Sequence, residues 1–216
     1  ENVFDYLLSA GVKGIVVACN TATSVAVRRL RGRYPDLPIV GIEPAIKPAA
    51  KNHEGGRIVV MATSVTLRRP KFAHLMESFR QSAEIISMAC PSIVDFVEKD
   101  KMNSQELMNY LTKKFAALGD RPADAVVLGC THYPLIEKVI REYMGDDVTL
   151  INSGAEVAKY LKKKLTKENL LHDGKCDENQ YRYYVSDDIS SFEELGGIFL
   201  EREINGQVNK IDIEKY

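Results

Sequence analysis

Short apolar runs alternate along this chain with longer stretches in which apolar residues recur at helical spacing. The short runs are rich in β-branched and aliphatic residues, as expected of strands that are buried on both faces of a sheet. Strands are predicted at residues 15–18, 38–42, 58–62, 85–86, 125–128, 148–151, 181–185 and 198–200. Helices are predicted at residues 2–10, 21–32, 63–79, 103–118, 134–144 and 153–164. This alternation predicts an α/β fold with parallel sheets.

Prolines and capping residues mark where these elements end and begin. Pro44 and Pro48 interrupt the pattern after the second predicted strand, and we place a crossing between domains there. Asn103 and Ser153 each stand three positions before a glutamate, which is the spacing of a capping box. Both residues are therefore predicted to cap the start of a helix.

The composition narrows the possible functions by exclusion. With 216 residues, 45% of them hydrophobic, the chain can form one large domain or two small ones around a sizeable core. Its 29 Lys and Arg nearly balance its 30 Asp and Glu, so no basic field favours nucleic acid as a partner. No apolar run approaches the length of a membrane span. We therefore expect neither nucleic acid nor a membrane as a partner.

The four cysteines lie far apart and lack both CxxC spacing and paired histidine ligands. They are Cys19, Cys90, Cys130 and Cys176. We therefore expect no metal site and no disulfide framework, and a reduced, cytoplasmic protein. Cys90 and Cys176 are interpreted as small buried side chains. The histidines at positions 53, 74 and 172 lie in polar or helical stretches and are interpreted as ordinary surface or helix residues.

Two of the cysteines occur in matched contexts. Cys19 follows the apolar run 15–18, Cys130 follows the run 125–128, and a predicted helix comes after each of them. Each cysteine should therefore lie at the carboxyl end of a central strand, where α/β sheets bind their ligands. Either cysteine alone would be interpreted as a small buried side chain. The pair predicts two thiols that face one substrate from opposite sides.

Two opposed thiols are suited to inverting a carbon centre. A thiolate on one face can remove a proton while a thiol on the other face delivers one. A free thiol has a pKa near ~8.5, and a turn before a helix favours the anion. Backbone N–H groups together with Asn20, Thr21 and Thr131 could hold a substrate carboxylate. His132 could tune the Cys130 thiol or act as a proton shuttle.

At these residues the chain resembles a known family. The motifs Ala18-Cys19-Asn20-Thr21-Ala22, Gly41-Ile42-Glu43-Pro44-Ala45 and Leu128-Gly129-Cys130-Thr131-His132-Tyr133-Pro134 are similar to those of glutamate racemases. Shorter matches occur at residues 62–66, 90–91 with 97–98, 152–154 and 184–188, so the resemblance covers nearly the whole chain. Glutamate racemases are cofactor-independent bacterial enzymes that make D-glutamate for peptidoglycan.

The resemblance implies a role for each matching residue. The catalytic acid/bases would be Cys19 and Cys130, with His132 and Glu98 assisting on the Cys130 side. The residues that bind substrate would be Asn20, Thr21, Thr63, Thr66, Thr131 and His132. The resemblance also implies two doubly wound α/β domains related by a pseudo-twofold, with the active site in the cleft between them. Mapped here, residues 1–43 plus 153–216 form the first domain and 44–152 the second. A homodimer is expected, without cofactor or metal.

The chain also departs from the family pattern. It lacks the Asp-Ser-Gly and Tyr-Gly motifs that family members carry near their N-terminus, so we expect residues 1–216 alone to have little racemase activity. Val65 stands where many members have glycine, and Asn152 where aspartate is common.

Three other functions are compatible with the residues. A related enzyme that uses the same two-thiol mechanism could racemise aspartate. A cysteine nucleophile with a histidine base could hydrolyse or transfer amides, although His132 is close in sequence to Cys130 and such an enzyme needs no second matched cysteine. A noncatalytic chain could bind small acids or a protein partner.

Overall fold

The computed structural model describes residues 2–172, 174 and 180–216, so Cys176 lies outside the described residues. The chain divides into two compact units. The larger comprises Val16–Lys164, and the smaller combines Glu1–Ile15 with Leu165–Tyr216. Among the described residues, no helix combines the length and apolar character needed to cross a bilayer.

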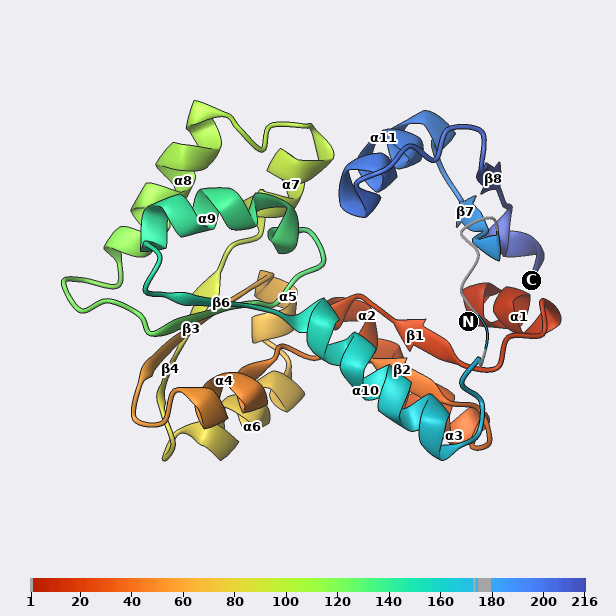
Figure 1. Ribbon diagram of the computed structural model, residues 1–216, viewed down its shortest axis with the longest axis horizontal. Helices are drawn as coiled ribbons and strands as arrows, with labels where there is room; N and C mark the ends of the chain where they lie inside the picture. The colour runs from red at the N-terminus through yellow and green to blue at the C-terminus, as the bar shows by residue number, and fades with distance from the viewer. Residues whose placement is uncertain (1, 173, 175–179) are drawn as a thin grey trace. The chain divides into compact units, whose positions relative to one another are not determined.

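A four-stranded parallel sheet forms the centre of the larger unit, in the order β4-β3-β5-β6 (Figure 1). The strands are β3 (Arg57–Ala62), β4 (Glu84–Ala89), β5 (Ala125–Leu128) and β6 (Thr149–Asn152). Helices α4 (Ile46–Asn52) and α6 (Pro70–Phe79) cover one face, and α7 (Ser92–Glu98), α8 (Gln105–Ala116) and α9 (Glu137–Met144) cover the other (Figure 1). The predicted α/β fold with parallel strands wound on both faces is confirmed.

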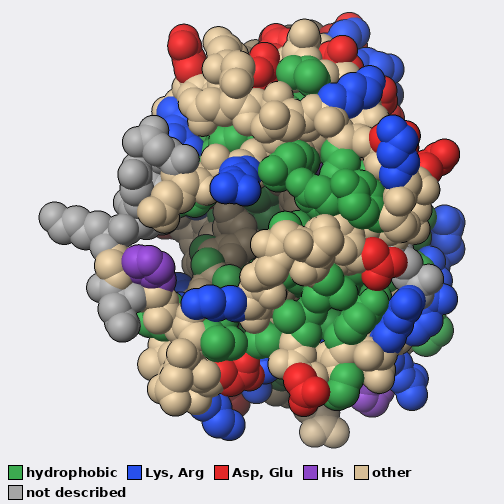
Figure 2. Space-filling model, turned by 90° about the vertical axis from the view of Figure 1, so that its right-hand side faces the viewer, with side chains coloured by type: hydrophobic (Ala, Val, Ile, Leu, Met, Phe, Trp, Pro, Cys, Tyr) green, Lys and Arg blue, Asp and Glu red, His purple; other side chains and the backbone are tan. Residues whose placement is uncertain are grey.

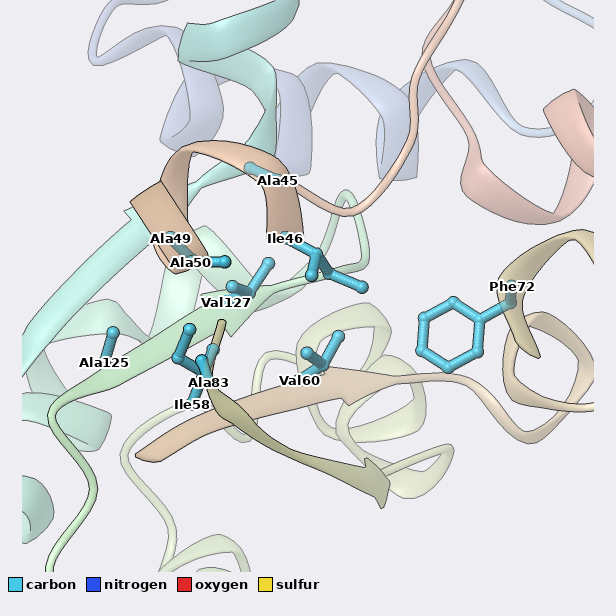
Figure 3. Packing of buried hydrophobic residues seen from close by; sticks show 10 residues of the cluster. All are labelled: Ala45, Ile46, Ala49, Ala50, Ile58, Val60, Phe72, Ala83, Ala125 and Val127. Carbon is cyan, nitrogen blue, oxygen red and sulfur yellow. The ribbon is translucent and has the colours of Figure 1, made fainter. Parts of the chain in front are cut away.

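The core of this unit is built from alternate residues of the central strands. Ile58 and Val60 of β3 and Val127 of β5 lie on the side of the sheet that faces α4, and they share a cluster with Ile46 of that helix (Figure 3). The residues between them face the opposite layer of helices, because side chains alternate across a strand. All residues of β5 and all but the first of β3 are buried, which explains why these runs read as continuously apolar.

A second, smaller sheet pairs β1 (Ile15–Val17) with β2 (Ile39–Gly41). A continuous helix lies between them in sequence and consists of α2 (Asn20–Ala22), the π-helical turn η1 (Thr23–Val27) and α3 (Arg28–Arg33). A Cβ atom placed on Gly41 would lie 2.5 Å from Thr23 Cγ2. Glycine at this position therefore allows β2 to approach the helix closely.

The larger unit also contains α5 (Ser64–Leu67) and most of α10 (Ser153–Lys167). The sequence predicts one helix over residues 63–79, but the structure has two, α5 and α6. Pro70 starts α6, and Arg69 before it is extended at φ −78° and ψ 135°. A residue that precedes proline is disfavoured in helical geometry, which explains the break.

The smaller unit contains α1 (Asn2–Ser9), α11 (Ile189–Leu200) and the parallel pair β7 (Tyr183–Val185) and β8 (Val208–Lys210). A short 3₁₀ turn, η4 (Ile213–Lys215), precedes the C-terminus. The ring of Tyr6 packs edge-on against Tyr184 and Tyr216, with centroids 5.2 and 5.1 Å away.

The strand predicted at residues 198–200 is wrong, because these residues form the last turn of α11. Asp188 caps this helix by accepting a hydrogen bond from Ser191 N, and Glu201 ends it in the left-handed region at φ 52°. The predicted capping residues also differ. Ser104 rather than Asn103 caps α8, and Ser153 uses its hydroxyl elsewhere.

Positive and negative side chains are interspersed on the face of the molecule shown in Figure 2. This distribution agrees with the near-zero net charge of −1. Clusters of hydrophobic side chains are also visible there between the charged ones (Figure 2).

Candidate active site

Both matched cysteines lie just beyond the end of a strand. Cys19 is extended, at φ −96° and ψ 123°, and directly precedes α2. Cys130 follows β5 after Gly129, and the 3₁₀ turn η2 (Tyr133–Ile136) and α9 come after it. Cys19 is exposed and Cys130 is half-buried, and both are free thiols. The local strand–cysteine–helix pattern predicted from the sequence is therefore present twice.

A single side chain joins the two cysteine turns. Asn20, which follows Cys19, donates a hydrogen bond from Nδ2 to the carbonyl oxygen of Gly129 at 2.9 Å. Asn20 is only 6% exposed, although it is polar. Its Oδ1 atom is buried and has no hydrogen-bond partner among the described groups. This oxygen is therefore available to a donor on a ligand.

Gly129 is required by the close approach of β5 to β3. Its N–H donates to Met61 O at 2.8 Å, and a Cβ atom on Gly129 would lie 2.6 Å from that same oxygen. No side chain fits there without a backbone shift. The glycine before Cys130 therefore sets where β5 ends relative to β3.

Three threonine hydroxyls gather beside the Cys19 turn. Thr21 Oγ1 lies 3.4 Å from Thr63 Oγ1 and 3.3 Å from Thr66 Oγ1, and the latter two are 3.1 Å apart. Thr63 also caps α5 by accepting a hydrogen bond from Thr66 N. The structure thus brings together three of the residues implied by the resemblance. Each hydroxyl can rotate to donate to an anion or accept from a cation.

His132 connects the Cys130 turn to α7. Its Nδ1 atom lies 3.8 Å from Cys130 Sγ and 3.2 Å from Thr131 Oγ1. Its Nε2 atom lies 2.5 Å from Oε1 of Glu98, the last residue of α7. A separation of only two residues does not suggest that His132 and Cys130 act as a histidine–thiol pair. The turn nevertheless brings the His132 ring to 3.8 Å from the Cys130 sulfur.

The surroundings of His132 favour its protonated form. The hydrogen bond with Cys130 has the largest effect and raises the pKa of His132, and the Glu98 carboxylate adds to this rise. Burial acts in the opposite direction, and the resulting pKa is about 9. The ordinary value is about 6.5, so these contacts shift the imidazole toward its protonated form.

Cys90 and Tyr133 form a buried contact behind the Cys130 turn. Tyr133 Oη donates to the carbonyl oxygen of Cys90 at 2.7 Å, and both residues are fully buried. Burial raises the pKa of the Cys90 thiol to about 11. The interpretation of Cys90 as a buried apolar side chain is confirmed. The anchoring role of Tyr133 was missed, since its place next to Pro134 and Leu135 signals only burial.

A small pocket opens beside Asn20, and Thr66 also lines it. Neither Cys19 nor Cys130 is among its lining residues, which combine apolar side chains with polar and charged ones. Glu43 and Lys71 form an ion pair within this lining. Over the described ranges, no group of three or more His, Cys, Asp and Glu side chains is placed to hold a metal ion.

Comparison with known proteins identifies the family. Residues 2–161 match the family model described as Asp/Glu/Hydantoin racemase. The chain is 45% identical to a glutamate racemase of Clostridium novyi over 171 residues, which are 79% of this chain and 66% of that protein. It is 41% identical to a glutamate racemase of Clostridium perfringens over 178 residues, 82% and 68% of the two chains. The chain belongs to the glutamate racemase family.

The structure agrees with this assignment. The crystal structure of the glutamate racemase isoform RacE1 from Bacillus anthracis superposes with a TM-score of 0.85 at 28% identity, covering 98% of this chain and 78% of that one. The resemblance to glutamate racemases predicted from the cysteine motifs is therefore confirmed. The chain spans about two thirds of the length of the two clostridial relatives.

Proposed function

We propose that the whole protein interconverts L-glutamate and D-glutamate by acid/base chemistry at Cys19 and Cys130, without a cofactor. The observation that carries this proposal is the hydrogen bond from Asn20 to Gly129, which makes the two cysteine turns neighbours. Membership in the glutamate racemase family supports glutamate as the substrate. The product D-glutamate would supply peptidoglycan synthesis in the cytoplasm.

The proposed reaction needs one thiolate and one thiol. With glutamate between the sulfurs, the thiolate removes the α-proton and becomes a thiol. The electron pair stays on the α-carbon and is delocalised into the carboxyl group until the second thiol delivers its proton to the opposite face. That second sulfur is then the thiolate. The enzyme is left poised for the reverse reaction, so no external acid or base is consumed.

The neighbouring side chains have distinct proposed roles. The protonated ring of His132, held by Glu98, favours negative charge on the Cys130 sulfur and can exchange a proton with it. Asn20, Thr21 and Thr131 bind the amino and carboxyl groups of the substrate. The hydroxyls of Thr63 and Thr66 extend this polar surface next to Thr21. Four hydroxyls and one amide can match the donors and acceptors of an amino acid.

We further propose that residues 1–43 plus 153–216 form one domain of the enzyme and 44–152 the other. In support, the sheet β4-β3-β5-β6 and helices α4 to α9 all lie within 44–152. A homodimer is proposed as the assembly.

Replacing each cysteine in the full-length protein tests this function. Cys19→Ala and Cys130→Ala should each lower kcat for both enantiomers by at least about 10²–10⁴-fold, the usual contribution of a general acid or base. The serine variants should leave only a trace, because a hydroxyl is far less acidic than a thiol. Circular dichroism follows the inversion of either enantiomer, and Cys90→Ala is the matched control that should retain activity. A normal rate in Cys130→Ala would contradict the two-thiol mechanism, and faster inversion of aspartate than of glutamate would contradict the substrate.

One observation favours a second candidate, cysteine-dependent acyl transfer. Cys130, His132 and Glu98 are arranged like the thiol, the histidine and the orienting carboxylate of a cysteine nucleophile, with separations of 3.8 and 2.5 Å. Cys19 would have no role in this reaction. Mass spectrometry after incubation with activated glutamyl esters discriminates between racemisation and acyl transfer. An acyl group that accumulates on Cys130 and turns over would favour acyl transfer.

A further inference from the structure

Two buried side chains from distant parts of the chain hold the carbonyl groups at the end of β5. Leu128 O accepts a hydrogen bond from Ser153 Oγ at 3.1 Å, and Gly129 O accepts the bond from Asn20. Ser153 is only 2% exposed. Both bonds act on the two residues that directly precede Cys130, so they restrain the start of the turn that carries this sulfur.

The hydroxyl of Ser153 also contacts a third segment. It accepts a hydrogen bond from Ala45 N at 3.2 Å, while it donates to Leu128. A hydroxyl has one donor and two lone pairs, so the two bonds are compatible. One oxygen thus joins the end of β5, the start of α10 and the segment after Pro44.

These contacts are not those of a helix cap. A capping serine accepts a hydrogen bond from an N–H in the first turn of its own helix. In this structure Gly154 N is instead bound by Asn152 Oδ1 at 2.8 Å. The Ser153 side chain is therefore directed at the sheet rather than at its own helix.

We propose that Ser153 is a positioning residue for the racemisation, and this inference rests on the function proposed above. Its hydroxyl fixes Leu128 and thereby sets where Cys130 stands relative to Cys19. Proton transfer requires each sulfur to lie within hydrogen-bond reach of the reacting carbon. A displacement of about 1 Å can lower a rate on the order of a hundredfold, so a bond two residues from Cys130 bears on catalysis.

The test compares Ser153→Ala with the wild type in the full-length protein. Loss of the hydroxyl should lower kcat about tenfold to a hundredfold while KM for glutamate stays within about threefold, since Ser153 has no proposed contact with the substrate. A rise in KM at constant kcat would overturn the proposal, because it would indicate a binding role.

A matched serine separates positioning from stability. Ser104 caps α8 by accepting a hydrogen bond from Leu107 N. Ser104→Ala should lower the melting temperature and leave kcat and KM unchanged. If Ser153→Ala lowered kcat no more than Ser104→Ala does, Ser153 would be only structural and the proposal would fail.

If Ser153→Ala does not fold, two further variants test whether Ser153 is a positioning residue. Ser153→Thr retains the hydroxyl and should keep most of kcat. Ser153→Cys has nearly the same shape but hydrogen-bonds weakly, and its kcat should fall. A cysteine variant that folds and keeps the wild-type kcat would overturn the proposal. An inactive wild type would instead refute the racemase function itself, so the two failures are distinguishable.

Discussion

Single residues around Cys130 act through partners that are far apart in the sequence. Asn20 and Gly129 are separated by 109 positions, and His132 and Glu98 by 34. The cysteines and His132 can be found from the sequence because their motifs are short and continuous. Their partners cannot be read from spacing, because a hydrogen bond between distant residues leaves no periodic signal. For Glu98 the resemblance alone implied a role, and the structure brings it into contact with His132.

The carboxylate of Glu98 contributes to the high pKa of His132, and removing its charge tests this contribution. Glu98→Gln keeps a hydrogen-bond acceptor but no negative charge. We expect the pKa of His132 to fall below its value of about 9. Titration of the His132 ring protons by NMR measures the shift. Glu77→Gln, at a carboxylate paired with Arg80, is the control and should not move this pKa. An unchanged pKa in Glu98→Gln would contradict the assignment.

At the scale of elements, the candidate site residues lie where strands end and helices begin. The helix after Cys19 contains the π-helical turn η1, and two side chains bond to backbone carbonyls near it. Thr23 Oγ1 donates to Val17 O at 3.0 Å, and Ser24 Oγ donates to Thr21 O at 2.7 Å. Turns of this kind are frequent at functional sites. The predicted strands 15–18 and 125–128 match β1 and β5 closely, whereas the turn type and the correct caps depend on local hydrogen bonds that the pattern does not specify.

Gly129→Ala tests how tightly the end of β5 is held against β3. The added Cβ atom would meet Met61 O at 2.6 Å, so β5 must move. We expect a loss of about 1–3 kcal/mol in the free energy of unfolding, the usual effect of overpacking, together with reduced racemase activity.

Urea unfolding followed by circular dichroism measures the effect of Gly129→Ala. The control is Gly32→Ala in α3, where nothing lies within 4 Å of the added atom. That variant should be stabilised by up to about 1 kcal/mol, because alanine is the better helix former. Equal stability of the two variants would refute the steric argument.

At the scale of the whole molecule, folding stability depends on pH through His132. Its folded-state pKa of about 9 lies above the ordinary value of about 6.5. A raised histidine pKa means that the folded state binds the proton more tightly than the unfolded state. The resulting stabilisation is fully present below pH ~6.5 and is lost as the pH rises through about 9.

Comparing wild type with His132→Asn isolates this contribution. The difference between their free energies of unfolding should be largest near pH 6 and should shrink steadily up to pH ~9.5, because other titrating groups cancel in the comparison. Urea unfolding at a series of pH values gives both curves. A difference that stays constant, or grows with pH, would show that folding does not raise the pKa of His132.

The sequence by itself determined the alternation of strands and helices, the two cysteines after buried strands and the family. These follow from local patterns, since side-chain periodicity and short motifs are properties of neighbouring residues. Only the tertiary structure decided that residues 198–200 end a helix, that Ser153 binds Leu128 instead of capping α10, and that Asn20 joins the two cysteine turns. The physical reason is that a buried polar atom takes whichever partner the packed chain brings within reach, and sequence separation places no limit on that choice.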